Sequence, residues 1–489
     1  MSFWDWIAEE KHLLTYPQTP HGPIGLMYPN EYSIGMANLG FQQVYRQFRE
    51  SGFSVERIFW DKKGRETRSV ENRTPLFRFP YLAASYTYEL DLFNLISMML
   101  RGGVEPLAAQ RGENAPLVIL GGQAASSNPA LLSRIADAIV LGEAETIVQK
   151  IAPVLEETAN SRRMALESLA AIPHVYAPAI HGVFERRQWT IHRLDALDAF
   201  PCHTVIHSQR DEFGGAFLLE LSRGCHYRCK FCIVPPQGGS ARYRDFDALT
   251  AALERHLDSF SKAGLLGAAV ADHPRVEDIV EWLVKRGKQV STSSLRAEKI
   301  SERLLDSLRE GGQQTITIAP ETGNIESRRR MGKGVSDEKY LRLAEMAGRR
   351  GFPHLKLYFL LGVPDGDPMR EADDIIRFVR QIEQAFCGAG GGRMTVTVSP
   401  FAPKPETPWS GENLWDAKAV KKASRIIRKH LSFHGNIKTP PVNVKEAWME
   451  TILCWAGPEA ADELLRAAKG EIALEEAFRN FDFAAMSRI

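Results

Sequence analysis

Three cysteines, Cys225, Cys229 and Cys232, fall within eight residues of one another. They follow a short apolar run at residues 216–221, and their spacing lets three thiolates on one loop turn toward a single centre. Thiolates suit an iron-sulfur cluster or another soft metal. Three ligands leave one iron of a 4Fe-4S cube without a protein ligand, and an open coordination position is typical of a metal site that performs chemistry. The spacing therefore predicts a reactive cluster.

Two other interpretations of these cysteines exist. A structural zinc ion would need one further ligand, which His226 or His273 could supply. The three residues could also be a chance group of buried thiols. The chain has only six cysteines, so a chance grouping of three in one loop is disfavoured.

At residues 222–232 the sequence resembles the radical SAM superfamily, whose signature is three cysteines at this spacing with an aromatic residue, here Phe231, before the last one. The resemblance implies that the three cysteines ligate a 4Fe-4S cluster and that S-adenosylmethionine binds its open iron near Phe231. In this family an electron from the cluster cleaves S-adenosylmethionine into methionine and a 5'-deoxyadenosyl radical.

The elements that must position this loop alternate between short apolar runs and amphipathic helices over residues 213–400. Six strands are expected at 217–221, 266–271, 290–293, 315–319, 355–361 and 394–398, and helices at 247–262, 276–286, 298–310, 336–350 and 370–386. Six strand-helix units predict a partial (β/α)6 barrel with its active site at the carboxyl ends of the strands. The cysteines follow the first strand, where a structural zinc ion has no reason to lie.

Polar residues follow the other expected strands. We expect Arg296 to pair with the methionine carboxylate, because a guanidinium fork matches a carboxylate. Asp272, Ser294 and Glu321 are further candidates for holding S-adenosylmethionine, the last two through its ribose hydroxyls and amino group. Alternatively, Arg296 pairs with the next helix, and Asp272 caps one. The basic segment 328–334 either meets an anion or is a solvated surface.

Residues 1–154 show a second alternation, with strands expected at 24–28, 55–60, 81–85, 117–120 and 138–141 and a helix at 90–101. This pattern predicts a doubly wound, Rossmann-like sheet that binds a ligand at the carboxyl ends of its strands. Gly121, Gly122 and Gly142 fall at such ends. They allow either a close approach of the backbone to a ligand or a tight turn.

Segments 28–40, 121–129 and 141–145 together resemble the cobalamin-binding domain that precedes the radical domain in some radical SAM proteins. The resemblance implies that loop residues hold the corrin and its nucleotide tail: Tyr28, Asn38, Gly121, Gly122, Gly142 and Glu143. The Asp-x-His-x-x-Gly motif that supplies an axial histidine elsewhere is absent. A cobalamin here would lack a histidine ligand, or the domain has kept the fold and lost the cofactor.

The remaining segments are a connector at 155–212, with a β-hairpin expected at 182–194 around a turn at 186–188, and a mainly helical region at 401–489. Prolines at 403, 405 and 408 prevent regular structure. This segment is expected to cross the barrel mouth, where Lys404 and Trp409 are candidate substrate contacts. Helices are expected at 417–433, 444–453 and 459–469. The first is strongly basic, which indicates a solvated face more often than a nucleic-acid surface.

The composition is that of an ordinary soluble globular protein, with 489 residues, 44% hydrophobic residues, 25% charged residues and a formal net charge of +1. This near-neutral balance argues against a dedicated nucleic-acid or membrane binder. Apolar runs fall short of the ~20 residues that span a bilayer. Cys202, Cys387 and Cys454 are scattered, which suits a reducing compartment, so we expect a cytoplasmic protein.

The resulting hypothesis is a cobalamin-binding radical SAM enzyme in which cobalamin carries a methyl group to a substrate that is a small molecule or of unknown class. An external low-potential electron donor of the flavodoxin or ferredoxin type is the expected partner. Two alternatives remain open. One is a cobalamin-independent radical SAM enzyme that modifies RNA, and the other is a non-catalytic protein that senses cobalamin or redox state through its cluster.

Overall fold

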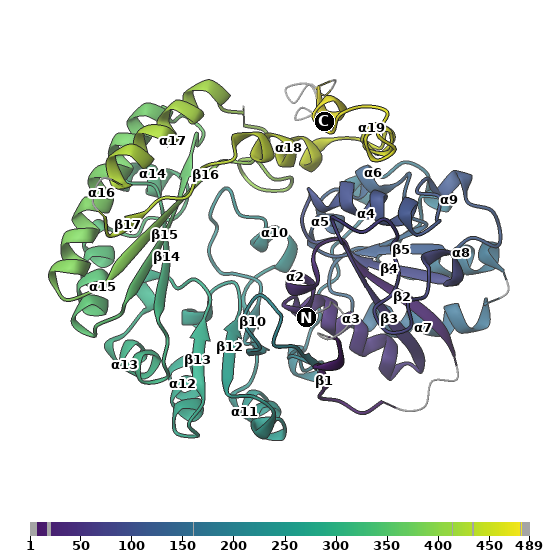
Figure 1. Cartoon of the computed structure of the whole chain (residues 1–489), viewed down its shortest axis with the longest axis horizontal. Coiled ribbons are helices and arrows are strands. Elements are labelled where there is room, and N and C mark those ends of the chain that lie inside the picture. Colours follow the sequence, from purple (N-terminus) through teal and green to yellow (C-terminus); the bar gives the residue numbers. More distant parts are fainter. Residues whose placement is uncertain are drawn as a thin grey trace. The chain divides into compact units, whose positions relative to one another are not determined.

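The computed structural model describes residues 7–16, 21–159, 161–412, 414–432, 435–479 and 481. The chain forms two compact units (Figure 1). The first contains the described residues up to Ala216 and those from Ile452 onward, and the second contains Phe217–Thr451. Each unit is built on parallel strands with helices packed against them, so the expected α/β class is confirmed.

The first unit contains a six-stranded sheet with the order β3-β2-β4-β5-β6-β7, in which only β7 is antiparallel. Its central strands are buried along most of their length, as continuous apolar runs require in a sheet covered on both faces. The strands are β2 (His21–Tyr28), β3 (Phe53–Phe59), β4 (Tyr81–Ser85), β5 (Leu117–Gly121), β6 (Ala138–Val140) and β7 (Val175–Tyr176).

Helices cover both faces of this sheet (Figure 1). Asn38 begins α3, because its Oδ1 accepts a hydrogen bond from the Phe41 backbone N–H at 2.9 Å. The helices are α2 (Tyr32–Met36), α3 (Leu39–Glu50), α4 (Asp91–Arg101), α5 (Gln123–Ser127), α6 (Pro129–Leu132), α7 (Glu145–Glu157), α8 (Arg162–Ala170), α9 (Pro178–His181) and α19 (Glu459–Ala468). A separate two-stranded ribbon pairs β1 (Lys11–His12) with β8 (Ile206–His207).

The strand order reverses direction between β2 and β4. Doubly wound sheets bind ligands at such a switch point, outside the carboxyl ends of the strands. The loops that follow β2 and β4 therefore define the expected ligand edge of the first unit.

The second unit contains two parallel sheets, with the orders β13-β12-β9 and β14-β15-β16-β17. A parallel bridge between Leu295 and Ile318 connects them. The strands are β9 (Phe217–Glu220), β12 (Lys262–Leu266), β13 (Gln289–Thr292), β14 (Thr315–Glu321), β15 (His354–Leu361), β16 (Arg393–Pro400) and β17 (Ile437–Lys438). All run in the same direction, so their carboxyl ends lie at one edge.

Helices α15 (Asp337–Arg349), α16 (Pro368–Gly388) and α17 (Ala417–Ser432) lie outside strands β14, β15 and β16 (Figure 1). Burial alternates along these strands, and the half-buried positions carry Thr317, Tyr358 and Thr397. The other helices are α10 (Val234–Gly238), α11 (Phe246–Arg255), α12 (Val276–Val284), α13 (Glu302–Glu310), α14 (Ile325–Arg330) and α18 (Val444–Trp455), and a short ribbon pairs β10 (Ser222–Arg223) with β11 (Arg242–Tyr243).

Two local predictions are wrong. The strand expected at 266–271 is instead Lys262–Leu266, because the sheet register pairs Ala263 with Phe217 and the chain leaves the sheet after Leu266. The hairpin expected at 182–194 is not formed, since this described segment contains only a 3-10 turn, Arg186–Gln188, and a single bridge at His192. Phe184 and Trp189 pack on Tyr176 instead of pairing across a ribbon.

Within the described part of the chain, no helix combines the length and the apolar character needed to cross a membrane.

Candidate active site

The three cysteines lie on a loop that leaves the carboxyl end of β9 and is fastened to the segment after α10. The Cys225 backbone N–H donates to the Gly239 carbonyl at 3.0 Å. Gly224 has a φ of +74°, and a Cβ atom there would lie 2.4 Å from the Ser240 carbonyl oxygen. Only glycine fits this position, so its place before the first cysteine follows from the close packing of two loop segments.

A second attachment holds the middle of the cysteine loop to the segment after α14. The Lys230 N–H donates to the Met331 carbonyl at 2.9 Å, and the Cys229 thiol lies 3.9 Å from the Gly332 carbonyl oxygen. Arg328 holds that segment in place. Its fully buried guanidinium donates to the Thr322 and Val335 carbonyls at 2.7 and 2.9 Å, and it forms a salt bridge with Asp337. The basic segment is therefore partly structural rather than wholly solvated.

A small apolar cluster supports the loop from the C-terminal side. Met331, Val363, Phe401 and Trp409 form it, and Phe231 packs against it. The Trp409 N–H donates to the Lys230 carbonyl at 3.0 Å. Phe231 and Trp409 are thus brought together, and Trp409 supports the cysteine loop. Lys404 pairs with Glu450 at 2.6 Å.

The thiols lie close enough to affect one another electrostatically. Burial raises the pKa of Cys229, whereas the Lys333 and Arg296 cations oppose this shift. Burial likewise raises the pKa of Cys232 to about 11, and the other two cysteines add to the shift. A metal ligand must be a thiolate, so nearby cations favour the state that binds a cluster.

Polar side chains gather on the β12–β13 side of the loop. The Tyr227 hydroxyl donates to Asp272 Oδ1 at 2.8 Å, and the Arg296 guanidinium stacks 3.4 Å from the centroid of the Tyr227 ring. Arg296 also pairs with Glu298 through Nε at 2.7 Å. Arg296 thus makes an ion pair with the segment that follows it, which was the alternative to pairing with the methionine carboxylate. Asp272 contacts Tyr227 and Lys299 rather than capping a helix.

Three buried oxygens in this region have no hydrogen-bond partner among the described residues. They are Asp272 Oδ2, Ser293 Oγ and Glu298 Oε2. A buried polar atom without a partner carries a free-energy cost of about 1–3 kcal/mol. Unused acceptors beside the cysteine loop suit a ligand with hydroxyl and amino groups, such as S-adenosylmethionine. Ser294 is exposed at the end of β13.

Glu321 ends β14 with a φ of +66°, an unusual conformation for a residue other than glycine. Its side chain is 11% exposed and accepts a hydrogen bond from Lys333 Nζ at 2.7 Å. The pair lies within electrostatic range of Cys229. Glu321 and its counter-charge Lys333 therefore lie near the cysteine loop.

His273, one of the two candidate fourth ligands for a zinc ion, is engaged with the backbone. Both ring nitrogens of His273 contact backbone atoms, at 2.9 Å to the Arg244 carbonyl and 3.1 Å to the Arg275 N–H.

In the first unit, side chains from the loops after β2 and β4 meet across the switch point. The Tyr28 hydroxyl lies 3.3 Å from Thr87 Oγ1 and 3.4 Å from Asn38 Nδ2. Asn30 Nδ2 donates to Asp91 Oδ1 at 2.9 Å. Two large apolar side chains near this edge, Ile34 in α2 and Tyr88 in the loop after β4, are 39% and 40% exposed. An apolar surface at this edge suits a flat, hydrophobic ring system.

The glycines of this edge are explained by packing within the chain. A Cβ on Gly122 would lie 2.5 Å from the Tyr86 carbonyl oxygen, and one on Gly142 would lie 2.2 Å from that of His192. Glu143 accepts a hydrogen bond from the Leu194 N–H at 2.6 Å. Gly121 differs, because a Cβ there would lie at an ordinary 3.6 Å from the Val140 Cβ, so packing does not require a glycine. In α5, which follows, the buried Ser127 Oγ has no partner among the described residues.

Sequence reasoning missed Tyr227, Ser293, Glu298 and Lys333 as members of the site. Tyr227 meets Asp272 across 45 positions, and Lys333 meets Glu321 across 12. Local patterns carry no signal for such pairs. Lys333 was visible only as part of a basic segment.

Two family models match separate parts of the chain. Residues 219–379 match the family described as "Radical SAM superfamily", and residues 40–178 match "Radical SAM proteins, N-terminal". An uncharacterized protein of Methanocaldococcus jannaschii is 23% identical over 410 residues, which cover 83% of each chain. The chain belongs to the radical SAM superfamily.

Two solved structures share the fold. The radical S-adenosylmethionine methyltransferase TsrM from Kitasatospora setae, solved with cobalamin and a 4Fe-4S cluster, matches with a TM-score of 0.57 and 14% identity over 92% of this chain and 99% of TsrM. The cobalamin-dependent radical enzyme OxsB, solved with aqua-cobalamin, matches with a TM-score of 0.53 and 14% identity over 95% of this chain and 63% of OxsB. The fold of this radical SAM protein is therefore that of cobalamin-dependent members of the superfamily.

Proposed function

We propose that this enzyme holds a 4Fe-4S cluster on Cys225, Cys229 and Cys232 and binds S-adenosylmethionine at the remaining iron. The observation that carries the proposal is the fastening of the cysteine loop on both sides, to Gly239 and to Met331, beside unused buried acceptors. When bound, the cluster supplies the electron that cleaves S-adenosylmethionine. The protein contributes orientation and the exclusion of water.

Different residues around the cysteine loop bind different groups of S-adenosylmethionine. Arg296 stays beside the cysteines on the Tyr227 ring and offers donors for the methionine carboxylate. Asp272 Oδ2 and Glu298 Oε2 accept from amino and hydroxyl groups, and Ser293, Ser294 and Glu321 complete the set. Phe231 supports the loop through the apolar cluster around Met331. We infer that β9, β12, β13, β14, β15 and β16 form the partial (β/α)6 barrel whose carboxyl ends carry this site, with β17 added at the edge of the second sheet.

We infer that the first unit binds cobalamin at the edge between β2 and β4, without a histidine ligand. The support is the strand order, the exposed apolar side chains of Ile34 and Tyr88, the contact of Tyr28 with Thr87 and Asn38, and the fold shared with TsrM. Bound cobalamin would supply methyl-group transfer. Gly121, Gly122, Gly142 and Glu143 shape the neighbouring loops, and Ser127 offers a free oxygen to the ligand.

The proposed reaction is the methylation of a small-molecule substrate. The half-buried threonine and tyrosine positions on β14, β15 and β16 offer it hydrogen bonds. The three cysteines outside the loop are scattered, so the electron comes from an external donor of the flavodoxin or ferredoxin type.

The cluster is tested by anaerobic reconstitution of the wild type, the triple variant Cys225→Ala/Cys229→Ala/Cys232→Ala and the control Cys387→Ala. Iron and sulfide content and the yield of 5'-deoxyadenosine with a strong reductant are measured. We expect the triple variant to lose both, while the control keeps them. Cleavage by the triple variant would refute the assignment, and a cluster without cleavage would favour a sensing protein.

The cobalamin site is tested by adding hydroxocobalamin, desalting and recording the absorption spectrum. We expect near-stoichiometric corrinoid in the wild type and a loss in Ile34→Asp, because a carboxylate would replace apolar contact with the corrin. Met164→Asp, at a 57% exposed position of α8, is the matched control. Absence of corrinoid from the wild type would contradict this part of the proposal.

A further inference from the structure

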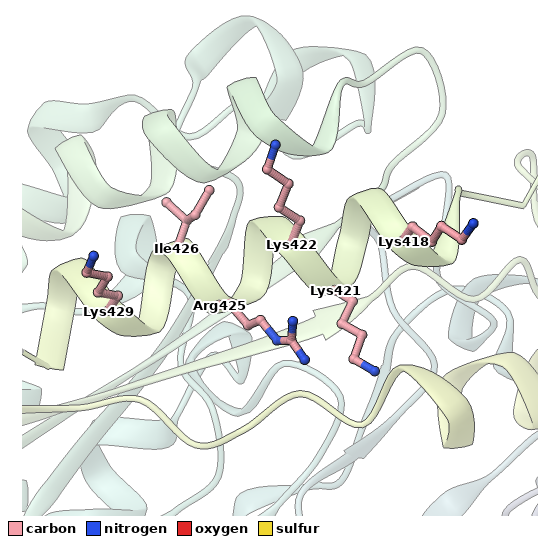
Figure 2. A pocket seen from close by; sticks show the side chains of 6 residues that line it. All are labelled: Lys418, Lys421, Lys422, Arg425, Ile426 and Lys429. Atoms are coloured by element: carbon pink, nitrogen blue, oxygen red, sulfur yellow. The ribbon is translucent and has the colours of Figure 1, made fainter.

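Helix α17 carries a row of cations that the proposed catalytic function does not use. Lys418, Lys421, Lys422, Arg425 and Lys429 surround a surface hollow of about 400 Å³ together with Ile426 (Figure 2). Arg428 and His430 are exposed on the same helix, which contains no acidic residue. Lys418, Lys421, Lys422, Arg425, Arg428 and Lys429 define the basic face of α17.

The cations of the basic face have no acidic partner. None of Lys418, Lys421, Lys422, Arg425, Arg428 and Lys429 forms a salt bridge with the described part of the chain, although most other arginines of the second unit do. An isolated helix would be destabilised by like charges spaced three and four residues apart. No contact among the described residues compensates the repulsion between these cations.

The apolar side of α17 is buried within the second unit. Val420, Ala423, Ile427 and Leu431 are buried, and α17 packs on α16. Only Ile426 adds apolar surface to the basic face. A helix that inserts into a lipid surface needs a free apolar face, so a membrane is a poor match.

The composition of the basic face indicates whether an acidic protein or a nucleic acid is the better match. Lysine is depleted in protein-protein interfaces, where aromatic residues are enriched, and this face has four lysines around the hollow and no aromatic residue. From Lys418 to Lys429 the row extends about 16 Å along the helix, with neighbouring cations one turn apart. Such a row can follow several successive phosphates, and it offers no aromatic ring on which a base could stack.

We propose that the basic face of α17 binds the phosphate backbone of RNA without reading its sequence. Figure 2 shows Lys422 and Ile426 on one side of the helix axis and Lys421 and Arg425 on the other, so the cations form a broad strip rather than a point site. The proposal goes beyond the methyl-transfer function and does not depend on either cofactor.

The test uses the full chain and the variant Lys421→Gln/Lys422→Gln/Arg425→Gln. Binding to unfractionated tRNA and to a 30-nucleotide single-stranded RNA is followed by fluorescence anisotropy between 50 and 300 mM salt. We expect at least a tenfold loss of affinity, and a slope of log K against log salt that falls by about 2, because three phosphate contacts are removed.

The matched control is Lys285→Gln/Lys339→Gln/Arg342→Gln, which removes the same charge from exposed positions just after α12 and on α15. It should keep the wild-type affinity, as should Lys421→Arg/Lys422→Arg. The cysteine triple variant should also bind RNA normally, which separates this proposal from the catalytic one. Equal losses in the two glutamine variants, no RNA binding at 50 mM salt, or binding to phosphatidylserine vesicles instead of RNA would overturn it.

Discussion

Glu321 occupies a left-handed backbone conformation that its surroundings enforce. The φ of +66° costs about 1 kcal/mol for a residue with a Cβ, and such strain persists where neighbouring contacts fix it. Here the buried salt bridge to Lys333 and the packing of Thr322 and Gly323 supply those contacts. The carboxylate is therefore held in one position near Cys229.

Replacing Lys333 with methionine should destabilise the second unit by about 1–3 kcal/mol, because the Glu321 carboxylate would stay buried without its counter-charge. Thermal unfolding measures the loss, and calorimetric titration should show weaker S-adenosylmethionine binding. Lys339→Met, at an exposed position on α15, serves as the control. Equal stability of the two variants would contradict a role for the pair.

Asp91 makes the stability of the first unit depend on pH. The residue is 3% exposed, and burial raises the pKa of its carboxyl to about 7. The folded state therefore keeps a proton that the unfolded chain releases near pH 4. The free energy of unfolding is therefore undiminished by Asp91 below pH 4. It falls as the pH rises toward 7, by at most about 4 kcal/mol.

Asp91→Asn should remove this dependence, since the amide keeps an oxygen that accepts from Asn30 and has no proton to lose. Melting temperatures measured from pH 4 to 8 should converge at low pH, and the variant should be the more stable protein at pH 8. Asp195→Asn, an exposed site, should follow the wild type. Parallel profiles for wild type and Asp91→Asn would disprove the assignment.

At the scale of elements, α14 links the end of β14 to the cysteine loop. The buried Arg328 guanidinium satisfies two carbonyls and Asp337, and the turn after the helix presents the Met331 carbonyl to Lys230. The geometry of the cysteine loop thus depends on a helix whose sequence shows only basic residues.

Arg328→Met should cost about 3 kcal/mol, because two buried carbonyls and a carboxylate lose their donor together. Less iron should be incorporated on reconstitution, as the Met331 turn loosens. Arg329→Met, whose side chain is 63% exposed, should change neither quantity. Full iron incorporation in Arg328→Met would show that α14 does not position the loop.

The elements themselves could largely be predicted. The run at 81–85 coincides with β4, and the helix expected at 90–101 is α4 at Asp91–Arg101, because buried strands and amphipathic helices leave strong local patterns. The second strand of the second unit could not be located. Its true residues, Lys262–Leu266, include a lysine and a glycine, whereas the more apolar run beyond them lies outside the sheet. The position of this strand is set by its pairing with β9, which is distant in the sequence, so no local pattern reveals it.

At the scale of the whole molecule, the sequence predicts the cofactor class but not the contacts between distant segments. Cys225, Cys229 and Cys232 identify the site because their spacing is local. The partners of the site, from Tyr227 with Asp272 to Trp409 with Lys230, lie tens to hundreds of positions apart.

The C-terminal segment shows the same limit. Residues 401–489 read as one helical region, yet those from Ile452 fold with the first unit. Asn128 Nδ2 donates to the Leu453 and Ala456 carbonyls at 3.2 and 2.9 Å, and α19 packs on α4 and α6. A single asparagine between two short helices gives no hint of a contact more than 300 positions away.

The central claim is a cluster with three cysteine ligands and one iron left for S-adenosylmethionine. The most direct test is electron paramagnetic resonance of the anaerobically reduced protein with and without S-adenosylmethionine. We predict a 4Fe-4S signal whose g values change on addition, because the ligand binds the cluster itself. A spectrum that is unchanged by saturating S-adenosylmethionine would contradict the account.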